Sequence, residues 1–594
     1  MRFKASLASL ACAVSVLGLA ACSSSGGSST ASGSSSTAAP CATGASSSKA
    51  SGAGGSTTSG GSKTTLTMEQ SPVSSVSQNY NPFNQTSSAG NTLGFTQMIY
   101  EPLMQFNFLK PGSKPYPWLA TDLKWSNGGK TITFTLRKGV KFSNGEKFDA
   151  STAAWEFNQI KKYKDINTYG LPISSASAPN ATTLVVNFTS PQYTNEYAVA
   201  GQVDMVPQKA WSKVGDPGQY ADPKPAGTGP YTLKQFSSQG VTLTANPGYW
   251  GGKPSIPNLD FPTYSSNTPA NQALEDGSLT WAGNYVQNIQ TQFLDKSPNN
   301  HCWDVGTGTE DLYPNLTTYP FAGKDGLAVR QAISYGVNRQ QISQVGEGGQ
   351  QPPVQGPGSL TGLTLPKDKQ YVTSATAGLQ AKTDTAKAKQ ILQADGWKMG
   401  SDGYYAKNGK TLEFTVEDPS EYSDFIVDDN ILAAQLKKVG IKVDVKGTTV
   451  PGWNADLADG NFNAMMHWTN GGTTPYTMYD NWLDTSLDTG ASAKAATGDF
   501  ERFSGPEADK GTALLKAYAG VAPTDTAGQT KYVSQLGELM AKDLPVIPLF
   551  YGVAWGDYSD ANFTGWPSPS NPYEPIQPNG PFNEYTVLHL KPKS

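Results

Sequence analysis

Residues 23–62 are too poor in apolar side chains to fold, so any globular domain of this chain must follow them. This segment consists almost entirely of Ser, Gly, Ala and Thr. Such a composition offers too little apolar surface to offset the entropy lost on folding, so a flexible coil is expected. We therefore interpret residues 22–62 as a disordered tether and expect the globular part over residues 63–594.

The first 21 residues have the pattern of a secretory signal peptide. Arg2 and Lys4 precede an apolar run that ends in small residues, which is the order typical of such signals. The apolar run is too short for a membrane-spanning helix. Cys22 follows directly, and residues 19–22 (LAAC) resemble a bacterial lipobox.

The lipobox resemblance implies that Cys22 becomes the first mature residue and carries a lipid. The sequence then predicts an extracytoplasmic protein that is lipid-anchored to the outer face of the bacterial cell membrane. An ordinary signal peptide followed by an incidental cysteine is the alternative.

The charge of the chain excludes one class of partner. The 594 residues carry a formal net charge of −4, and loss of the signal peptide leaves −6. This mild acidity offers no basic surface, so nucleic acid is not expected as a partner. Charged residues make up 15% and aromatic residues 10% of the chain. That combination suits a neutral polar ligand, although most of the rings are expected in the core.

The cysteines show no metal-binding pattern. The chain has four cysteines, without a C-x-x-C pair or a zinc-ligand spacing, so no metal or cofactor is expected. Outside the cell, Cys41 and Cys302 could form a disulfide. The sequence alone leaves open whether they pair or remain free.

Local periodicity predicts alternating strands and helices. Apolar and polar residues alternate in 130–136 (KTITFTL), as in a half-buried strand. Asp149 is placed to cap a helix that buries Ala153, Phe157 and Ile160. Three further helices are expected. The first has an apolar stripe of Val329, Ala332, Ile333, Gly336 and Val337, and the second follows an Asp384 cap and buries Ala388, Ile391 and Leu392. The third buries Leu432, Leu436 and Val439 and ends at Gly440, and a strand with Ile441, Val443 and Val445 is expected after it. Units of this kind predict an α/β protein.

Five groups of segments together resemble a known family. They are 118–125 (WLATDLKW) with 130–145 (KTITFTLRKGVKFSNG), 227–231 (GTGPY) with 246–250 (NPGYW), 329–339 (VRQAISYGVNR), 436–443 (LKKVGIKV) and 543–549 (DLPVIPL). In this order they resemble the family 5 extracytoplasmic solute-binding proteins of ABC importers. That group handles oligopeptides, nickel chelates and some oligosaccharides.

The resemblance implies a two-lobed, periplasmic-binding-protein-like α/β fold with a ligand cleft between the lobes. Lobe I is expected over 63–302, with an inserted subdomain at about 100–220. Lobe II is expected over 303–550, and 551–594 would return to lobe I. The resemblance also implies a monomer that closes around a solute and delivers it to an ABC permease and its ATPase subunits.

Candidate ligand residues flank the expected cleft. Peptide-binding members often carry an acidic residue after a Trp in lobe II, but 465–476 (MMHWTNGGTTPY) has no acid between Trp468 and Tyr476. Ring faces and amide groups suit sugars instead. The candidates are Trp281, Asn284 and Tyr285 in lobe I, Trp468, Asn470 and Tyr476 in lobe II, and Asn84, with Trp453 and Trp555 as further aromatic candidates.

The segments around Trp281 and Trp468 are similar to those of cello-oligosaccharide-binding members of the family. We therefore expect a neutral oligosaccharide held between these two rings, with Asn284 and Asn470 orienting it. An oligopeptide is the alternative solute. The alternative for both Trp residues is a place in the core between the lobes.

Enzymatic motifs are absent from the sequence. None of the three His lies in H-E-x-x-H, the folded region has no G-x-S-x-G elbow, and 346–349 (GEGG) lacks the P-loop ending. His467 is interpreted as structural. Asp428 and Asp429 are interpreted as solvated surface, because adjacent helix residues point apart. We expect a binding protein; a secreted lipoprotein hydrolase, such as a glycosidase with distant carboxylates, and a surface adhesin are the other classes.

Overall fold

The computed structural model describes residues 41, 62–83, 89–110, 112–363, 365–487 and 498–594. All of them belong to one compact unit, residues 38–594. The signal peptide, Cys22, nearly all of the tether and the candidate Asn84 lie outside the described residues. Within the described part of the chain, no helix is both long enough and apolar enough to cross a bilayer.

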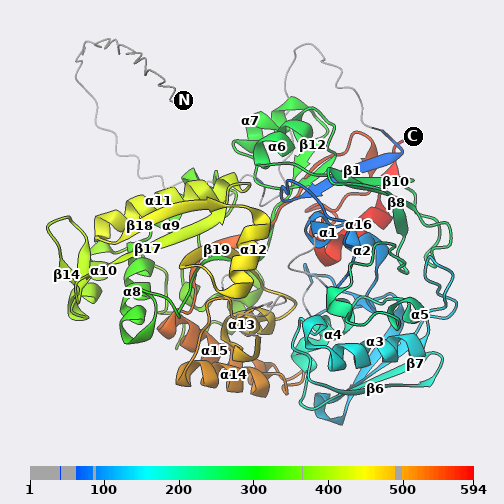
Figure 1. Cartoon of the computed structure of the whole chain (residues 1–594), viewed down its shortest axis with the longest axis horizontal. Helices are drawn as coiled ribbons and strands as arrows, with labels where there is room; N and C mark the ends of the chain where they lie inside the picture. Colours follow the sequence, from blue (N-terminus) through cyan, green and yellow to red (C-terminus); the bar gives the residue numbers. More distant parts are fainter. Residues whose placement is uncertain (1–40, 42–61, 84–88, 111, 364, 488–497) are drawn as a thin grey trace, which may run out of the picture. The chain divides into compact units, whose positions relative to one another are not determined.

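A mixed sheet of seven strands forms the centre of lobe I (Figure 1). Strand β1 runs parallel to both of its neighbours, β10 and β11, so Gln70 at the end of β1 lies beside Gly283 at the end of β11. The loops after these two strands therefore leave the sheet at the same edge. In order, the strands are β12 (Asn300–Cys302), β21 (Asp557–Ser559), β11 (Trp281–Gly283), β1 (Thr65–Gln70), β10 (Asn258–Pro262), β9 (Gly240–Ala245) and β8 (Tyr231–Ser237).

Short helices and two small ribbons complete lobe I. The helices are α1 (Ala89–Leu93), α2 (Thr96–Ile99), α6 (Asn267–Glu275), α7 (Ile289–Gln292) and α16 (Asn583–His589). The ribbons pair β2 (Met104–Gln105) with β3 (Tyr116–Pro117) and β22 (Phe563–Thr564) with β23 (Lys591–Pro592).

A four-stranded antiparallel sheet forms a subdomain that is inserted into lobe I. Its strands, in order, are β4 (Ala120–Ser126), β5 (Thr131–Leu136), β7 (Thr183–Phe188) and β6 (Ile173–Asn180), and its helices are α3 (Ala150–Lys162), α4 (Glu196–Gly201) and α5 (Gln208–Trp211). The strand expected at 130–136 is confirmed as β5. The Asp149 cap is also confirmed, because its carboxylate accepts from the backbone N–H groups of Ser151 and Thr152 at the start of α3.

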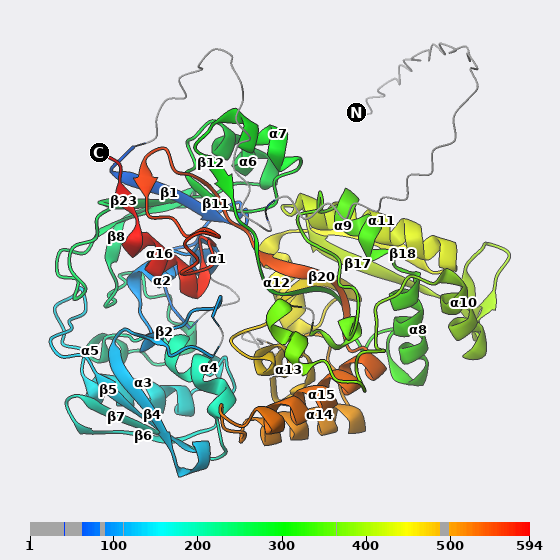
Figure 2. The same ribbon diagram turned by 180° about the vertical axis from the view of Figure 1, so that it is seen from behind.

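A five-stranded sheet, a small three-stranded sheet and eight helices make up the second lobe in the described chain; Figure 2 shows how they are arranged. The strands, in order, are β18 (Lys442–Thr448), β17 (Glu413–Pro419), β19 (Ala464–Asn470), β13 (Val305–Pro314) and β20 (Ile547–Ala554). The helices are α8 (Gly323–Gly336), α9 (Arg339–Val345), α10 (Thr385–Ala394), α11 (Ser423–Val439), α12 (Val450–Asp459), α13 (Pro475–Leu483), α14 (Pro506–Tyr518) and α15 (Thr526–Asp543), and a small sheet joins β14 (Lys398–Met399), β15 (Tyr405–Lys407) and β16 (Lys410–Thr411).

The three helices predicted in this lobe are confirmed as α8, α10 and α11. Asp384 caps α10 by accepting from the backbone N–H of Lys387. Helix α11 ends where Gly440 adopts a positive φ of 100°, a conformation that favours glycine. The strand predicted after Gly440 is confirmed as β18. Together the two sheets and their helices confirm the two-lobed α/β fold.

Asp428 and Asp429 are not on the surface, so their interpretation as solvated residues is wrong. Both side chains are buried in α11. They do point apart, but both sides of the helix are covered. Asp428 faces the loop that follows α9, and Asp429 interacts with Asp418 on β17. The spacing along the helix correctly predicts that the two side chains point apart. It does not show that other elements pack over both sides of the helix and bury them.

The chain crosses between the lobes twice, and the two crossings lie side by side. Trp303 and Asp304 lead from β12 to β13, while Trp555 and Gly556 lead from β20 back to β21. The backbone N–H of Trp303 donates to the carbonyl of Gly556 at 2.9 Å, and the N–H of Gly556 donates to Oδ1 of Asp304 at 3.2 Å. These contacts tie the two connecting segments together.

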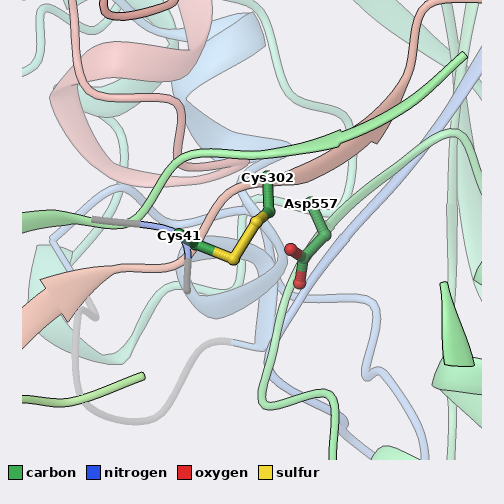
Figure 3. A group of neighbouring side chains, drawn as sticks. All are labelled: Cys41, Cys302 and Asp557. Carbon is green, nitrogen blue, oxygen red and sulfur yellow. A yellow bond between two sulfur atoms is a disulfide. The ribbon is translucent and has the colours of Figure 1, made fainter. Parts of the chain in front are cut away.

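Cys41 and Cys302 form a disulfide beside these crossings (Figure 3). Both residues are buried, and the backbone N–H of Asp304 donates to the carbonyl of Cys41 at 3.0 Å. The bond joins residue 41 to the end of β12, where the chain leaves lobe I. Asp557 lies next to the two sulfur atoms. The group is not a metal centre in this state, because metals bind the thiolate, whereas these sulfurs are bonded to each other.

Candidate ligand-binding site

A cavity of about 440 Å³ lies between the lobes. This size falls in the usual range for small-molecule sites. The loops that follow β1 and β11 form its wall in lobe I, and β13, β19, α11 and α12 contribute the wall in lobe II. Residues of the inserted subdomain, among them Asn195 and Tyr197, close one side.

The lobe I wall carries amide and phenol groups at the carboxyl ends of parallel strands. Asn284 and Tyr285, which directly follow β11, both line the cavity. The Asn284 Nδ2 donates to Oδ1 of Asn271, while its own Oδ1 has no hydrogen-bond partner among the described residues. The ring of Tyr285 meets that of Trp555 edge to face, with centroids 6.2 Å apart. Both predicted residues therefore reach the cavity, together with the further candidate Trp555.

The lobe II wall presents an exposed indole. Trp468 on β19 is 41% exposed and lines the cavity. It lies directly opposite Glu310 of β13 in the antiparallel ladder, so both side chains lie on the same face of the sheet. Glu310 also lines the cavity. An aromatic face and a carboxyl group therefore stand next to each other on this wall.

Two further rings support Trp468. The imidazole of His467 stacks on Trp468 and on Trp453, with centroid distances of 4.6 and 4.9 Å. Nε1 of Trp453 donates to Oδ1 of Asp418 at 3.0 Å, which holds this indole in place. Burial lowers the pKa of His467 to about 4, so its ring is uncharged at neutral pH. His467 lines the cavity as an aromatic support and brings no positive charge to it.

Trp281 is part of the core and does not line the cavity. It is fully buried, its Nε1 donates to the carbonyl of Ile576 at 3.2 Å, and its ring packs against Trp566. This placement corrects the expectation that Trp281 faces Trp468 across the cleft. Both faces of β11 are covered, and the chain reaches the cavity only after the strand has ended.

Tyr476 and Asn470 also differ from the expected arrangement. Tyr476 is buried in α13 against the ring of Tyr518 and does not itself line the cavity, although its side chain contacts the lining residues Asp480 and Asn195. Asn470 ends β19 opposite Gly308 in the ladder, and its side chain lies outside the described residues. The predicted residues that the structure brings together around the cavity are therefore Asn284, Tyr285 and Trp468.

Several acidic and amide groups in the cavity were not found from the sequence. Glu310, Asp424 and Asp480 line it, as do Asn267, Asn454, Asn481 and Asn579. No local motif marks the acids, since Glu310 lies inside a strand and Asp424 lies in the first turn of α11. Among the described residues that line the cavity there is no Lys and no Arg. The wall thus combines aromatic rings, amides and carboxyl groups.

Comparison with known proteins identifies the family. Residues 114–489 match the model described as "Bacterial extracellular solute-binding proteins, family 5 Middle". The nickel-binding periplasmic protein of Escherichia coli is 28% identical over 422 residues, which cover 67% of this chain and 74% of that protein. Protein XP55 of Streptomyces lividans is 30% identical over 340 residues, which cover 56% of this chain and 59% of XP55.

Solved structures show the same architecture. A mannohexaose-bound periplasmic oligopeptide-binding protein of Thermotoga maritima has a TM-score of 0.80 at 25% identity, covering 89% of this chain and 99% of that one. The oligopeptide-binding protein AppA of Bacillus subtilis, in complex with a nonapeptide, has a TM-score of 0.72 at 20% identity, covering 90% and 99%. The nickel-binding protein and the Thermotoga maritima protein are solute-binding proteins, in agreement with the expectation of a binding protein without enzymatic activity. This chain belongs to the family 5 bacterial extracellular solute-binding proteins, which serve ABC importers.

Proposed function

We propose that this protein captures a neutral oligosaccharide between its lobes and delivers it to an ABC permease that is driven by ATPase subunits. The observation that carries this proposal is the exposed indole of Trp468 in a cavity whose described lining has no Lys or Arg. Sugar rings have apolar C–H faces that pack on aromatic rings and hydroxyl groups that need donors and acceptors. The mannohexaose in the Thermotoga maritima protein supports a sugar.

The two walls offer complementary contacts to such a solute. Trp468 provides a flat face on lobe II, and the edge-to-face pair of Tyr285 and Trp555 provides aromatic surface on the other side. Oδ1 of Asn284 is an acceptor without a donor, which a sugar hydroxyl could satisfy. Leaving such a buried acceptor unpaired costs about 1–3 kcal/mol. A polyhydroxylated solute would remove this cost.

The permease would recognise the closed form of the protein, which a bound solute stabilises. Nδ2 of Asn267 in lobe I donates to Oδ1 of Asp424 in lobe II at 3.1 Å, and Nε2 of Gln350 in lobe II donates to the carbonyl of Val286 in lobe I at 3.0 Å. These bonds border the cavity and join the lobes. A solute that contacts both walls would favour the closed form, because a ligand stabilises the conformation to which it binds best.

We also propose a lipid-anchored monomer. The mature protein would begin at lipid-bearing Cys22 and extend through the tether, with lobe I over 63–302, its inserted subdomain at about 100–220, lobe II over 303–550 and a return at 551–594. The crossing next to residue 302 supports the first boundary, whereas β20 continues in lobe II to Ala554, so the second crossing lies a few residues beyond 550. The disulfide supports an oxidising location outside the cytoplasm.

Replacing Trp468 by alanine is expected to weaken oligosaccharide binding by about 10- to 100-fold. Burial of one large apolar side chain stabilises by about 1.5–3 kcal/mol, and each 1.4 kcal/mol is tenfold in affinity. Calorimetric titration with glucose and mannose hexamers would measure the change. Met399→Ala, which removes another exposed apolar side chain outside the cavity lining, should bind like the wild type.

A parallel titration with mixed oligopeptides tests the alternative solute. The oligosaccharide proposal would be abandoned if peptides bound tightly while neither hexamer gave any heat. That result would favour an oligopeptide-binding protein of the same importer class.

A further inference from the structure

Four carboxyl groups gather where lobe II meets the lobe I side of the cavity. We call Glu310, Glu347, Asp424 and Asp428 the acidic cluster. They come from β13, from the loop after α9 and from successive turns of α11. Each is more than nine-tenths buried. Glu310 and Asp424 line the cavity, and Glu347 and Asp428 lie behind them. The cluster includes two features that the family fold does not explain, the glycine-rich 346–349 and the buried Asp428.

Three of the eight carboxyl oxygens in the cluster accept no hydrogen bond from a described residue. Nε2 of Gln351 donates to Oε2 of both Glu310 and Glu347, and Nδ2 of Asn267 donates to Oδ1 of Asp424. Oε1 of Glu347 and both oxygens of Asp428 accept no hydrogen bond from an amide, hydroxyl or basic group of the described residues, and the two carboxyl groups lie within hydrogen-bonding reach of each other. The side-chain carbonyl oxygens of Gln350 and Gln351 are also buried without a partner. The site is therefore rich in acceptors and poor in donors.

The loop 346–349 holds the acceptors close together. A Cβ atom at Gly346 would lie 1.5 Å from Oδ1 of Asp428, so the backbone approaches this carboxyl as only glycine allows. A Cβ atom at Gly348 would lie 3.2 Å from the hydroxyl of Tyr285. The loop thus packs between α11 and the lobe I wall of the cavity.

No described cation balances the cluster. The charged groups that act on Glu310 and Asp428 are other members of the cluster and Asp311. Arg339 donates to the carbonyl groups of Pro548 and Ser334. Burial and mutual repulsion raise the pKa of Glu310 and Asp428 well above the usual range; burial raises that of Glu347 to about 8 and that of Asp424 to about 6. A buried cation would relieve this repulsion.

We propose that the acidic cluster is a subsite for a protonated primary amine of the solute, which enters between Glu310 and Asp424. This inference rests on the proposed function and narrows it: the solute is an oligosaccharide with one protonated amino group at this end of the cavity, while its other sugar residues are neutral. An ammonium group donates three hydrogen bonds and accepts none. It therefore matches carboxylates and the free amide oxygens of Gln350 and Gln351.

A divalent metal ion fits the cluster less well. Such an ion requires several oxygens at short distance, and among the described residues no three carboxyl groups of the cluster have oxygens within 4.8 Å of one another. An amine needs only two carboxylates with amide or carbonyl oxygens. A peptide N-terminus carries the same ammonium group as an amino sugar, so the experiment must separate these two sources.

The test compares solutes that differ only in the amino group. Calorimetric titrations at pH 7 and low salt would use a glucose hexamer whose terminal residue is glucosamine (called the glucosamine hexamer), its N-acetylated form and an unmodified glucose hexamer. We expect the glucosamine hexamer to bind at least tenfold more tightly than the other two. Glu310→Gln and Asp424→Asn should each reduce this preference to within about twofold. Asp480→Asn changes another carboxyl of the cavity lining and should keep the preference, whatever it does to affinity itself.

Thermal unfolding of each variant establishes that it is folded. Because two separate variants are used, the test can still be made if one of them does not fold. If the glucose hexamer binds and the glucosamine hexamer binds no better, the amine subsite is rejected and the proposed function stands. If no sugar binds, but tripeptides with a free amino terminus bind more tightly than N-acetylated ones and only when Glu310 is present, the amine subsite is supported and the oligosaccharide is rejected.

Discussion

Replacing Cys302 by serine is expected to lower the free energy of unfolding by about 4 kcal/mol. The disulfide with Cys41 spans 261 residues, and a bond that closes a long loop restricts the unfolded chain strongly; losses of about 2–5 kcal/mol are typical. Urea unfolding, followed by tryptophan fluorescence, would measure the difference. Cys41→Ser should give the same loss, because both substitutions remove the same bond.

A reductant provides the matched control for this prediction. It should destabilise the wild type as much as the substitution does, and it should leave Cys302→Ser unchanged. Free-thiol titration of the denatured, unreduced wild type should detect neither Cys41 nor Cys302. Two reactive thiols from these residues would show that the bond is not formed in the protein.

Raising the pH from about 5 to 8 is expected to destabilise the protein, and Glu69 should contribute a large share. Glu69 is fully buried in β1, and no hydrogen-bond donor reaches either of its oxygens in the described structure. Burial raises its pKa from 4.5 to about 8. The groups that interact with it electrostatically include Tyr264 and Tyr422, and neither supplies a positive charge.

The sign follows from proton binding. Between the pKa of the unfolded chain and that of the folded protein, Glu69 holds a proton only when folded. The stability from this group is therefore complete below about pH 4.5 and is lost as the pH rises to about 8. One pKa unit corresponds to 1.36 kcal/mol, so the loss from this residue is about 5 kcal/mol at most. Burial shifts the pKa of Glu101, Glu347 and Asp429 in the same direction.

Urea unfolding at pH 5, 6, 7 and 8 would test this prediction. Glu69→Gln keeps the shape of the side chain and cannot ionise, so its stability should fall less steeply with pH than that of the wild type. Glu538→Gln changes an exposed side chain on α15 and should keep the wild-type slope. Equal slopes for all three proteins would mean that Glu69 is ionised in the folded state.

The local parts of the fold were predictable from sequence because their signals are local. The alternation in 130–136, the Asp149 and Asp384 caps and the stop at Gly440 all appear where they were expected. The site was predictable only in part. Trp468, Asn284 and Tyr285 reach the cavity, whereas Trp281 belongs to the core. An aromatic residue in a strand gives the same sequence pattern in the core and in the wall of a cavity. Only the layer that packs above the residue distinguishes the two positions.

The acidic cluster had no signal in the sequence. Its members are spread over 119 positions, from Glu310 to Asp428, and each acid, taken alone, has the pattern of an exposed residue. Asp428 illustrates this. It points away from its neighbour Asp429, but the glycine-rich loop covers Asp428 and strand β17 covers Asp429. Burial of an acid depends on what packs against it, which the spacing along one helix does not contain.

Several strands and helices, the residues that cap them and the resemblance to the family could be recognised from sequence, because each depends on residues close together in the chain. Only the folded structure brings Cys41 to Cys302, covers Trp281 while it exposes Trp468, and gathers four distant acids, of which Glu310 and Asp424 line the cavity. Whether a side chain is buried, and whether a charge finds a partner, depends on which elements pack against each other, and residues distant in the chain decide that packing.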